Sequence, residues 1–321
     1  MANGNRSKNH HWWPVGLQRY WADRSGDVSW IEPSGIVDKK RSTNRKIGFK
    51  IHGHTIFRGT VWESNFEEEF DIDNEVHNII ASLEGLKPFG SSPKEFFALI
   101  KLLLKKNRSL RDMCNFYHLD EDLHRNLLLL IHSLLIRSPA NRSRYEGYPK
   151  LMGLPPDEEV GKANMAENYR IAKKLCRNGL ISNQYFVLLH SPLKKFIFGD
   201  GSLDWLTSSL VADRINGRAL LPLTPHLCVY FCTPMSMRST PNCASFSVAP
   251  WMVDWINDIT QIYSREKLFF LGKRPKLTEA FRQHQFLKHK DKTDVMVDML
   301  DEIAGIKKHR NAIGFGMSGL L

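Results

Sequence analysis

The chain is poor in cysteine and lacks the signatures of several common enzyme classes. Its five cysteines lie between Cys114 and Cys243. An odd number without a paired spacing argues against a disulfide framework and favours a reducing compartment. The sequence also has no Walker loop and no GxGxxG, GxSxG, HExxH or paired CxxC motif. These absences argue against P-loop nucleotide hydrolysis, a Rossmann cofactor, serine hydrolysis and thermolysin-like proteolysis.

Long apolar runs are also missing. The longest, residues 127–136, is interrupted by His132 and Ser133, and it is far shorter than the roughly 20 residues that a membrane span needs. The beginning of the sequence has no apolar segment that resembles a signal peptide. We therefore expect a cytoplasmic protein without a membrane partner.

The charge is strongly unbalanced. Lysine and arginine number 45 against 34 aspartates and glutamates, which gives a net charge of +11. Such a surplus favours a polyanionic partner, such as nucleic acid or an acidic surface. The alternative is a basic protein whose charge only keeps it in solution. A protein partner or a homo-oligomer stays open.

The patterning of apolar residues predicts an α+β fold. A small antiparallel β-unit is expected over residues 10–60 and a helical block over about 70–180, followed by short strands. Residues 1–9 are expected to be flexible, 10–272 to form a single domain, and 273–321 to form a basic, partly helical tail. A chain of 321 residues can bury roughly three quarters of its unfolded surface, which is enough for a core without covalent links.

Individual elements follow from periodicity and capping residues. Strands are predicted at 28–31, 47–57, 185–189, 196–198, 220–223, 227–231 and 268–271. Helices are predicted at about 75–85, 93–108, 109–117, 120–136, 162–177 and 251–263. Asp73 or Asn74 is expected to cap the first of these helices and Ser92 the second. Residues 137–148 are expected to form a basic loop.

The most unusual stretch is His10-His11-Trp12-Trp13-Pro14, which continues to Trp21. It holds three of the eight tryptophans and two of the thirteen histidines. Because chain ends are usually polar, this composition predicts that Trp12, Trp13 and Trp21 are at least partly buried.

The histidines are the first candidates for chemistry. His52 and His54 lie two apart on the predicted strand and should point to the same side. They can bind a divalent metal ion or act as acid and base, with His10 or His11 as a third member. Adjacent histidines face opposite ways, so one of the two should point inward. The alternative is that these are structural histidines bonded to backbone.

Asp200 is the second candidate. It follows a predicted strand, where a rigid backbone can present a catalytic carboxylate. Gly199 and Gly201 on either side would let a substrate approach closely. The alternative is an ordinary Asp-Gly turn.

A basic cluster is the third candidate. Arg137, Arg142 and Arg144 alternate with Tyr145 and Tyr148. Arginines beside aromatic side chains suit phosphate contact and base stacking, so this cluster is predicted to bind nucleic acid. A solvated loop is the alternative.

Several segments in a fixed order resemble the bacterial DUF4238 family, a domain of unknown function. They are the HHWWP block with Leu17 and 21–23, the strand with His54, NFEEEFDIDN at 65–74, the helix end at 137–139, the strand 196–198 leading to Asp200, LPLTP at 221–225, and Asn257. Together they span about residues 8–272, and HHWWP is the most specific. The family usually has an Asp-Asn-Pro-like turn where this chain has Asp200-Gly201-Ser202. The resemblance implies a shared fold and supplies no reaction.

The resulting prediction is a nuclease-like enzyme that acts on RNA or DNA phosphodiesters, as a toxin or phage-defence effector. His10 or His11, with His54 and Asp200, would transfer protons or hold a divalent metal ion. One alternative is a non-enzymatic module that binds nucleic acid or protein. Another is an enzyme that acts on a small nucleotide, with Asp200 lining its pocket.

Overall fold

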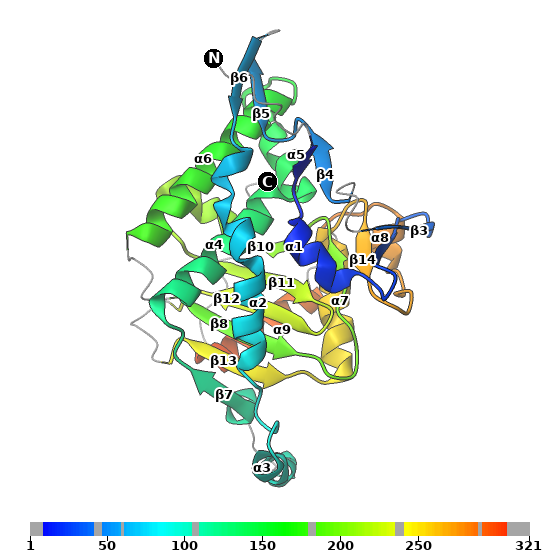
Figure 1. The fold of residues 1–321 in the computed structure, drawn as a ribbon, viewed down its shortest axis with the longest axis vertical. Coiled ribbons are helices and arrows are strands. Elements are labelled where there is room, and N and C mark those ends of the chain that lie inside the picture. Colours follow the sequence, from blue (N-terminus) through cyan, green and yellow to red (C-terminus); the bar gives the residue numbers. More distant parts are fainter. Residues whose placement is uncertain are drawn as a thin grey trace.

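The computed structural model describes residues 9–41, 47–58, 61–104, 109–178, 184–234, 241–287 and 291–306. It has the predicted α+β fold, with antiparallel sheets and a helical block. In Figure 1 a central sheet occupies the lower body, with helix α2 (Val76–Gly85) in front of it and α9 (Asp291–Ala304) behind it.

The central sheet has six strands. In spatial order they are β10 (Leu203–Asp204), β11 (Arg218–Thr224), β12 (Leu227–Cys232), β8 (Tyr185–His190), β13 (Cys243–Ser247) and β7 (Cys114–Tyr117). Only the β13–β8 pair is parallel among them. The apolar sequences of β8 and β12 are buried almost throughout, as expected for strands that are covered on both faces. All five cysteines are buried, and none is bonded to another.

A second sheet pairs strands from the N-terminal part of the chain with strands from its C-terminal half. Its order is β3 (Val37–Arg41), β2 (Asp27–Ile31), β14 (Leu268–Phe270) and β9 (Phe198–Gly199). Two two-stranded sheets complete the N-terminal region: β1 (Asn9–His11) with β4 (Phe49–Ile51), and β5 (Thr55–Arg58) with β6 (Val61–Asn65). The strands of the antiparallel β-unit predicted over residues 10–60 do pair antiparallel, but they are distributed over three sheets instead of one unit.

The remaining helices lie mainly in the middle of the chain. They are α1 (Val15–Gln18), α3 (Pro93–Leu103), α4 (Glu121–Arg137), α5 (Pro139–Glu146), α6 (Glu158–Arg177), α7 (Pro250–Tyr263) and α8 (Glu279–Arg282). In the part of the chain that the structure describes, no helix combines the length and apolar composition of a membrane span.

Several predicted helix boundaries are confirmed. Ser92 accepts a hydrogen bond from the backbone N–H of Glu95 and completes a capping box with it at the start of α3. The Asp120 side chain accepts a hydrogen bond from the backbone N–H of Leu123 and caps α4. Helix α4 ends at Arg137, and Ser138 then caps α5.

Other predicted elements were wrong. The helix expected at 109–117 is a short 3-10 turn followed by β7, which the sheet recruits as an edge strand. The basic loop expected at 137–148 contains helix α5. Asp73 does not cap α2, whose N-cap Glu75 makes no side-chain bond there.

The strand predicted at 47–57 is broken. A turn over 52–54 separates β4 from β5, and His52 adopts a positive φ of 51°. His52 and His54 are therefore not related by the alternation of a strand.

The described residues at both ends of the chain are part of the folded structure. Residues 1–8 lie outside the described residues, while Asn9 begins β1. Helix α9, expected in a tail, packs against β8, β12 and β13. Its Asp301 accepts hydrogen bonds from Arg218 at 2.7 Å and from the Tyr230 hydroxyl at 2.6 Å.

Candidate functional site

The HHWWP segment is fixed against the second sheet. Trp12, Trp13 and Trp21 are all buried, as predicted. The backbone N–H groups of Trp12 and Trp13 both donate to the Gly48 carbonyl, at 2.9 and 3.1 Å. The ring of Trp13 stacks on Phe198 with a centroid distance of 4.6 Å. The segment is thus an anchored part of the core.

His10 and His11 face opposite ways on β1, as the alternation predicts. His10 is buried, whereas His11 is partly exposed. His10 therefore points towards the interior of the protein, where its ring stacks on that of His54 with centroids 5.4 Å apart and planes 15° apart.

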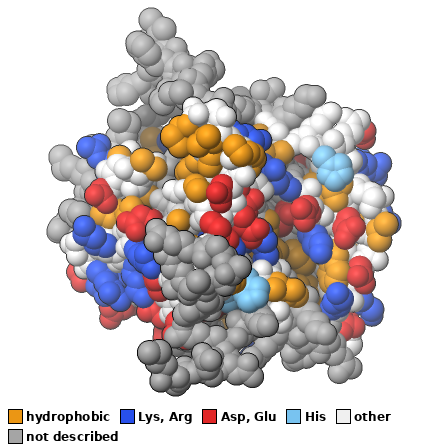
Figure 2. All heavy atoms as spheres, turned by 90° about the horizontal axis from the view of Figure 1, so that it is seen from above, with side chains coloured by type: hydrophobic (Ala, Val, Ile, Leu, Met, Phe, Trp, Pro, Cys, Tyr) orange, Lys and Arg blue, Asp and Glu red, His pale blue; other side chains and the backbone are white. Residues whose placement is uncertain are grey.

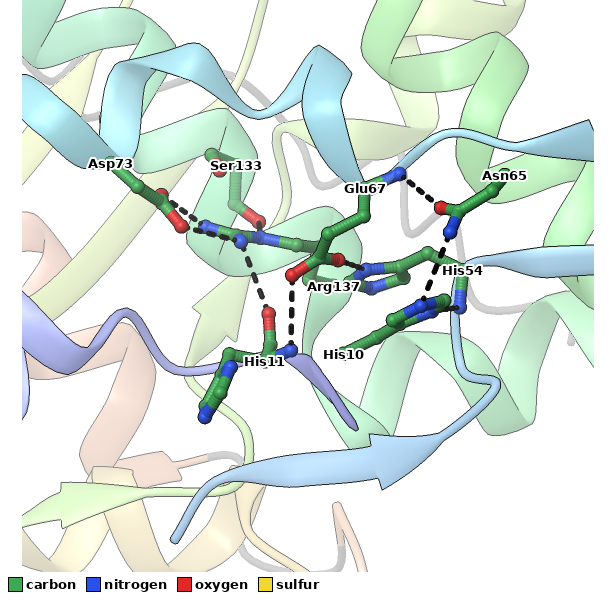
Figure 3. Close-up of polar contacts among 8 residues, drawn as sticks. All are labelled: His10, His11, His54, Asn65, Glu67, Asp73, Ser133 and Arg137. Carbon is green, nitrogen blue, oxygen red and sulfur yellow. Dashed lines mark hydrogen bonds and ion pairs between the residues drawn. The ribbon is translucent and has the colours of Figure 1, made fainter. Parts of the chain in front are cut away.

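The buried His54 pairs with the partly exposed Glu67, as Figure 3 shows. The Nδ1 atom of His54 donates to the Glu67 carboxylate. Burial, together with the positive charges of Arg137 and Arg142, holds the pKa of His54 well below its ordinary value. The imidazole is therefore neutral, with its proton on Nδ1. Its Nε2 atom is buried and has no hydrogen-bond partner in the described part of the chain.

His10 takes the opposite tautomer. Its Nδ1 accepts the backbone N–H of His54 at 2.7 Å. The proton of a neutral His10 therefore lies on Nε2, which is 3.4 Å from the amide nitrogen of Asn65. The two stacked rings thus carry their protons on different nitrogens.

Glu67 is a site residue that the sequence analysis missed. Its second carboxylate oxygen accepts the His11 backbone N–H at 3.3 Å, and its own N–H donates to Asn65 Oδ1 at 2.9 Å. Three consecutive glutamates at 67–69 gave no reason to single out one of them. Only the return of the chain beside the 52–54 turn identifies Glu67.

Arg137 holds the same segment from the other side (Figure 3). Its fully buried guanidinium donates to both oxygens of Asp73, at 2.6 and 2.9 Å. It also donates to the His11 carbonyl at 3.1 Å and lies 4.3 Å from the Phe70 ring centroid. Arg137 and Glu67 therefore bind the two backbone polar groups of His11.

Arg142 lies beside the 52–54 turn. It is buried, and its two terminal nitrogens have no hydrogen-bond partner among the described residues. A side chain at Gly53 would put its Cβ 3.0 Å from one of these nitrogens, so the glycine leaves room for the guanidinium. Burial lowers the pKa of Arg142, opposed by the charges of Glu146, Glu158 and Glu67.

The rest of the basic cluster is also tied into the fold. Arg144 donates to Thr207 at 2.6 Å, and Tyr145 is buried, which raises the pKa of its hydroxyl to about 12. The segment forms helix α5, which turns Arg142 and Tyr145 inward, and it is therefore not a solvated loop. Nucleic-acid binding by Arg137, Arg142, Arg144 and Tyr145 stays a prediction.

One face of the molecule shows how its surface charges are distributed. Figure 2 shows hydrophobic and acidic side chains gathered in the middle of the upper face, with lysines and arginines nearer its edges. On the described atoms of this face, positive charge does not form one continuous patch.

Asp200 does not join the histidines in any described hydrogen bond. It is buried, and its two oxygens accept the backbone N–H groups of Arg265 and Glu266, at 2.8 and 2.9 Å. Burial raises the pKa of Asp200 to about 6 despite these bonds. Its contacts match the alternative of a structural turn.

The flanking glycines serve packing. A Cβ on Gly199 would lie 1.9 Å from Ser264 Oγ, and one on Gly201 would lie 1.9 Å from the Tyr263 carbonyl oxygen. These glycines let the turn pack closely on the end of α7. They do not leave space for a substrate.

A metal ion is compatible with one group of described side chains. His10, His54 and Glu67 each offer a ligand atom, and these atoms lie within 4.8 Å of one another. Histidine and carboxylate ligands suit zinc and similar divalent ions. Binding would have to compete with the His54–Glu67 bond and with the bond to His10 Nδ1.

No family model, curated protein or solved structure matches the chain. The resemblance to DUF4238 therefore stays a prediction, and the site must be interpreted from its own geometry.

Proposed function

We propose that the protein is a nuclease-like enzyme that hydrolyses RNA or DNA phosphodiesters at the cluster formed by the buried His10, His54 and Arg142 and the partly exposed Glu67. The observation that carries the proposal is a pair of unpartnered polar groups beside one turn. Within the described residues, Nε2 of His54 and the terminal nitrogens of Arg142 have no hydrogen-bond partners. Buried groups of this kind call for a ligand, a water or a catalytic role.

The two groups suit the two needs of phosphodiester hydrolysis. The lone pair on His54 Nε2 can take a proton from an attacking water, while Glu67 fixes the tautomer and stabilises the cation that forms. The water oxygen bonds to phosphorus as the bond to the leaving oxygen breaks. The imidazolium formed on His54 then gives this proton to the leaving oxygen, and the Nε2–H of His10 can donate a hydrogen bond to the same oxygen.

Arg142 would bind the phosphate. A guanidinium presents paired donors that match phosphate oxygens. The two open nitrogens of Arg142, next to Gly53, provide such donors beside His54. As His11 is held through its backbone and Asp200 through its turn, neither is included in this proposal.

A second candidate function is a non-enzymatic module that binds nucleic acid or a protein partner. The observation that favours it is the burial of both histidines, 1% exposed for His10 and 0% for His54. In that case the HHWWP segment and its charged neighbours stabilise the fold, and a phosphate does not reach them.

One assay separates the two. Purified protein is incubated with end-labelled RNA and DNA in the presence of Mg²⁺, Mn²⁺, Zn²⁺ or EDTA. The first proposal predicts cleavage products, and their loss in EDTA would assign a metal to the site. Binding in a gel-shift assay without any product under all four conditions would reject the enzyme and support the binding module, with salt-dependent binding if the ligand is nucleic acid.

A further inference from the structure

A separate cavity of about 160 Å³ lies between residues 47–49, at the start of β4, and the second sheet. Four aromatic side chains contribute to its wall: Trp12, Trp30, Phe49 and Phe269. Its remaining lining includes Lys40, Lys267, Glu266 and Asp200. None of His10, His54 or Arg142 lines this cavity, so it is distinct from the cluster proposed for hydrolysis.

The charges at this cavity are arranged around one indole ring. The ammonium groups of Lys40 and Lys267 lie 5.8 and 5.3 Å from the Trp30 ring centroid. Neither lysine forms an ion pair with a described carboxylate. Two like charges beside one ring repel each other, and an anion between them would relieve that repulsion.

Trp30 itself is incompletely bonded. Its side chain is only 5% exposed, and its Nε1–H has no acceptor in the described parts of the chain. A buried indole N–H usually finds a partner. A ligand with a carbonyl oxygen close to a flat ring would supply one.

Two carboxylates, Asp200 and Glu266, also line the cavity and could repel an anion. The oxygens of Asp200 are both bonded to backbone N–H groups. Glu266 is exposed, so solvent screens its charge.

The size of the cavity restricts the ligand. A cavity of about 150 Å³ is enough to hold one benzene ring. The space therefore suits a single six-membered ring rather than a fused purine, with any further groups of the ligand lying at the opening.

We propose that this cavity binds a pyrimidine nucleotide, with the base between the aromatic side chains and the phosphate near Lys40 and Lys267. Base-to-aromatic stacking and lysine-to-phosphate contact are the usual means of holding such a ligand. A carbonyl of the base accepts the Trp30 N–H. The ligand is either a free nucleoside monophosphate or the terminal nucleotide of a strand.

The test is isothermal titration calorimetry of the full chain with UMP, CMP, uridine, AMP and inorganic phosphate. UMP and CMP are expected to bind at least tenfold more tightly than uridine, AMP or phosphate. A 5′-phosphorylated oligouridine distinguishes the sources. Tighter binding than UMP assigns the site to strand ends, and equal or weaker binding assigns it to the free nucleotide.

Matched variants test the residues. Lys40→Gln and Lys267→Gln should each weaken UMP binding at least fivefold. Lys39→Gln is the control, because this neighbour on β3 is exposed and pairs with Asp27 outside the cavity lining. Trp30→Phe keeps the ring and removes only the N–H, and it should weaken binding by a smaller factor. Each variant is checked for an unchanged melting temperature.

Two results would overturn the proposal. One is the absence of UMP and CMP binding at millimolar concentration by a folded protein. The other is UMP affinity that is the same in Lys40→Gln, Lys267→Gln and Lys39→Gln. Because His54 lies outside the cavity, His54→Gln should bind UMP with wild-type affinity. The nucleotide-binding proposal can therefore hold if the nuclease proposal fails, and the nuclease proposal can hold if nucleotide binding is absent.

Discussion

Arg137 and Asp73 form a two-point ion pair, 2.6 and 2.9 Å, that joins the last turn of α4 to the segment before α2. The same guanidinium donates to the His11 carbonyl. The pair therefore connects three segments that are far apart in sequence. It also explains why Asp73 is not available to cap α2.

Loss of this pair should destabilise the fold. Asp73→Ala leaves the buried charge of Arg137 without its carboxylate. The expected loss of unfolding free energy is about 2–4 kcal/mol. This is less than for a fully enclosed ion pair, because Asp73 is partly exposed. Urea denaturation measures the loss. Asp122→Ala, which removes an exposed pair with Arg125, is the control and should cost less than about 1 kcal/mol. Equal losses in the two variants would contradict the structural role of the pair.

Gly48 should tolerate no side chain. It has a φ of +61°, and an added Cβ would lie 2.6 Å from Trp13 Cβ. Gly48→Ala is expected to lose about 1–2 kcal/mol for the backbone conformation and roughly 1–3 kcal/mol more for the clash.

Gly153→Ala is the matched control for Gly48. Gly153 also has a positive φ, of 75°, but an added Cβ meets nothing within 4 Å. Gly153→Ala should therefore lose only the stability that the positive φ costs an alanine, as measured by thermal or urea unfolding. If the two variants were equally stable, the anchoring of Trp13 against Gly48 would be incorrect.

Asp200 should add a pH-dependent contribution to stability. Its pKa of about 6 exceeds the ordinary value of 3.8, so between these values the folded state binds more protons than the unfolded state. Stability from this group is then largest below about pH 4 and falls as the pH rises through 6. The difference in unfolding free energy between wild type and Asp200→Asn should be larger at pH 4.5 than at pH 7.5, by about 1–2 kcal/mol. A difference that is independent of pH would refute the raised pKa.

The contribution of His54 to stability should depend on pH in the opposite direction to that of Asp200. Because burial lowers its pKa well below 6.5, below pH 6.5 the unfolded state takes up a proton that the folded state does not. Stability from this group is complete above about pH 6.5 and declines in acid, at up to about 1.4 kcal/mol per pH unit. Unfolding curves from pH 7 to 5 should therefore fall less steeply in His54→Gln than in wild type. Parallel curves would mean that His54 is not held neutral.

Much of the fold could be predicted because its signals are local. The apolar runs of β8 and β12, the capping box at Ser92 and the end of α4 depend on neighbours in sequence. Strands β7 and β13 could not be predicted in this way. Each is a short segment whose strand conformation is stabilised by pairing with a distant partner.

The candidate site was only partly predictable for the same reason. Alternation along β1 correctly indicated that one of His10 and His11 points inward. The turn at 52–54, the approach of Glu67 and the burial of Arg142 depend on contacts between segments, and no local pattern marks them.

The rate of phosphodiester cleavage in matched variants tests the central proposal most directly. Initial rates on end-labelled RNA and DNA are compared for wild type, His54→Gln and the exposed control His118→Gln, at equal concentrations of folded protein. Loss of a general base predicts a fall of about 10²- to 10⁴-fold for His54→Gln and an unchanged rate for His118→Gln. Wild-type cleavage that persists at its full rate in folded His54→Gln would contradict the account.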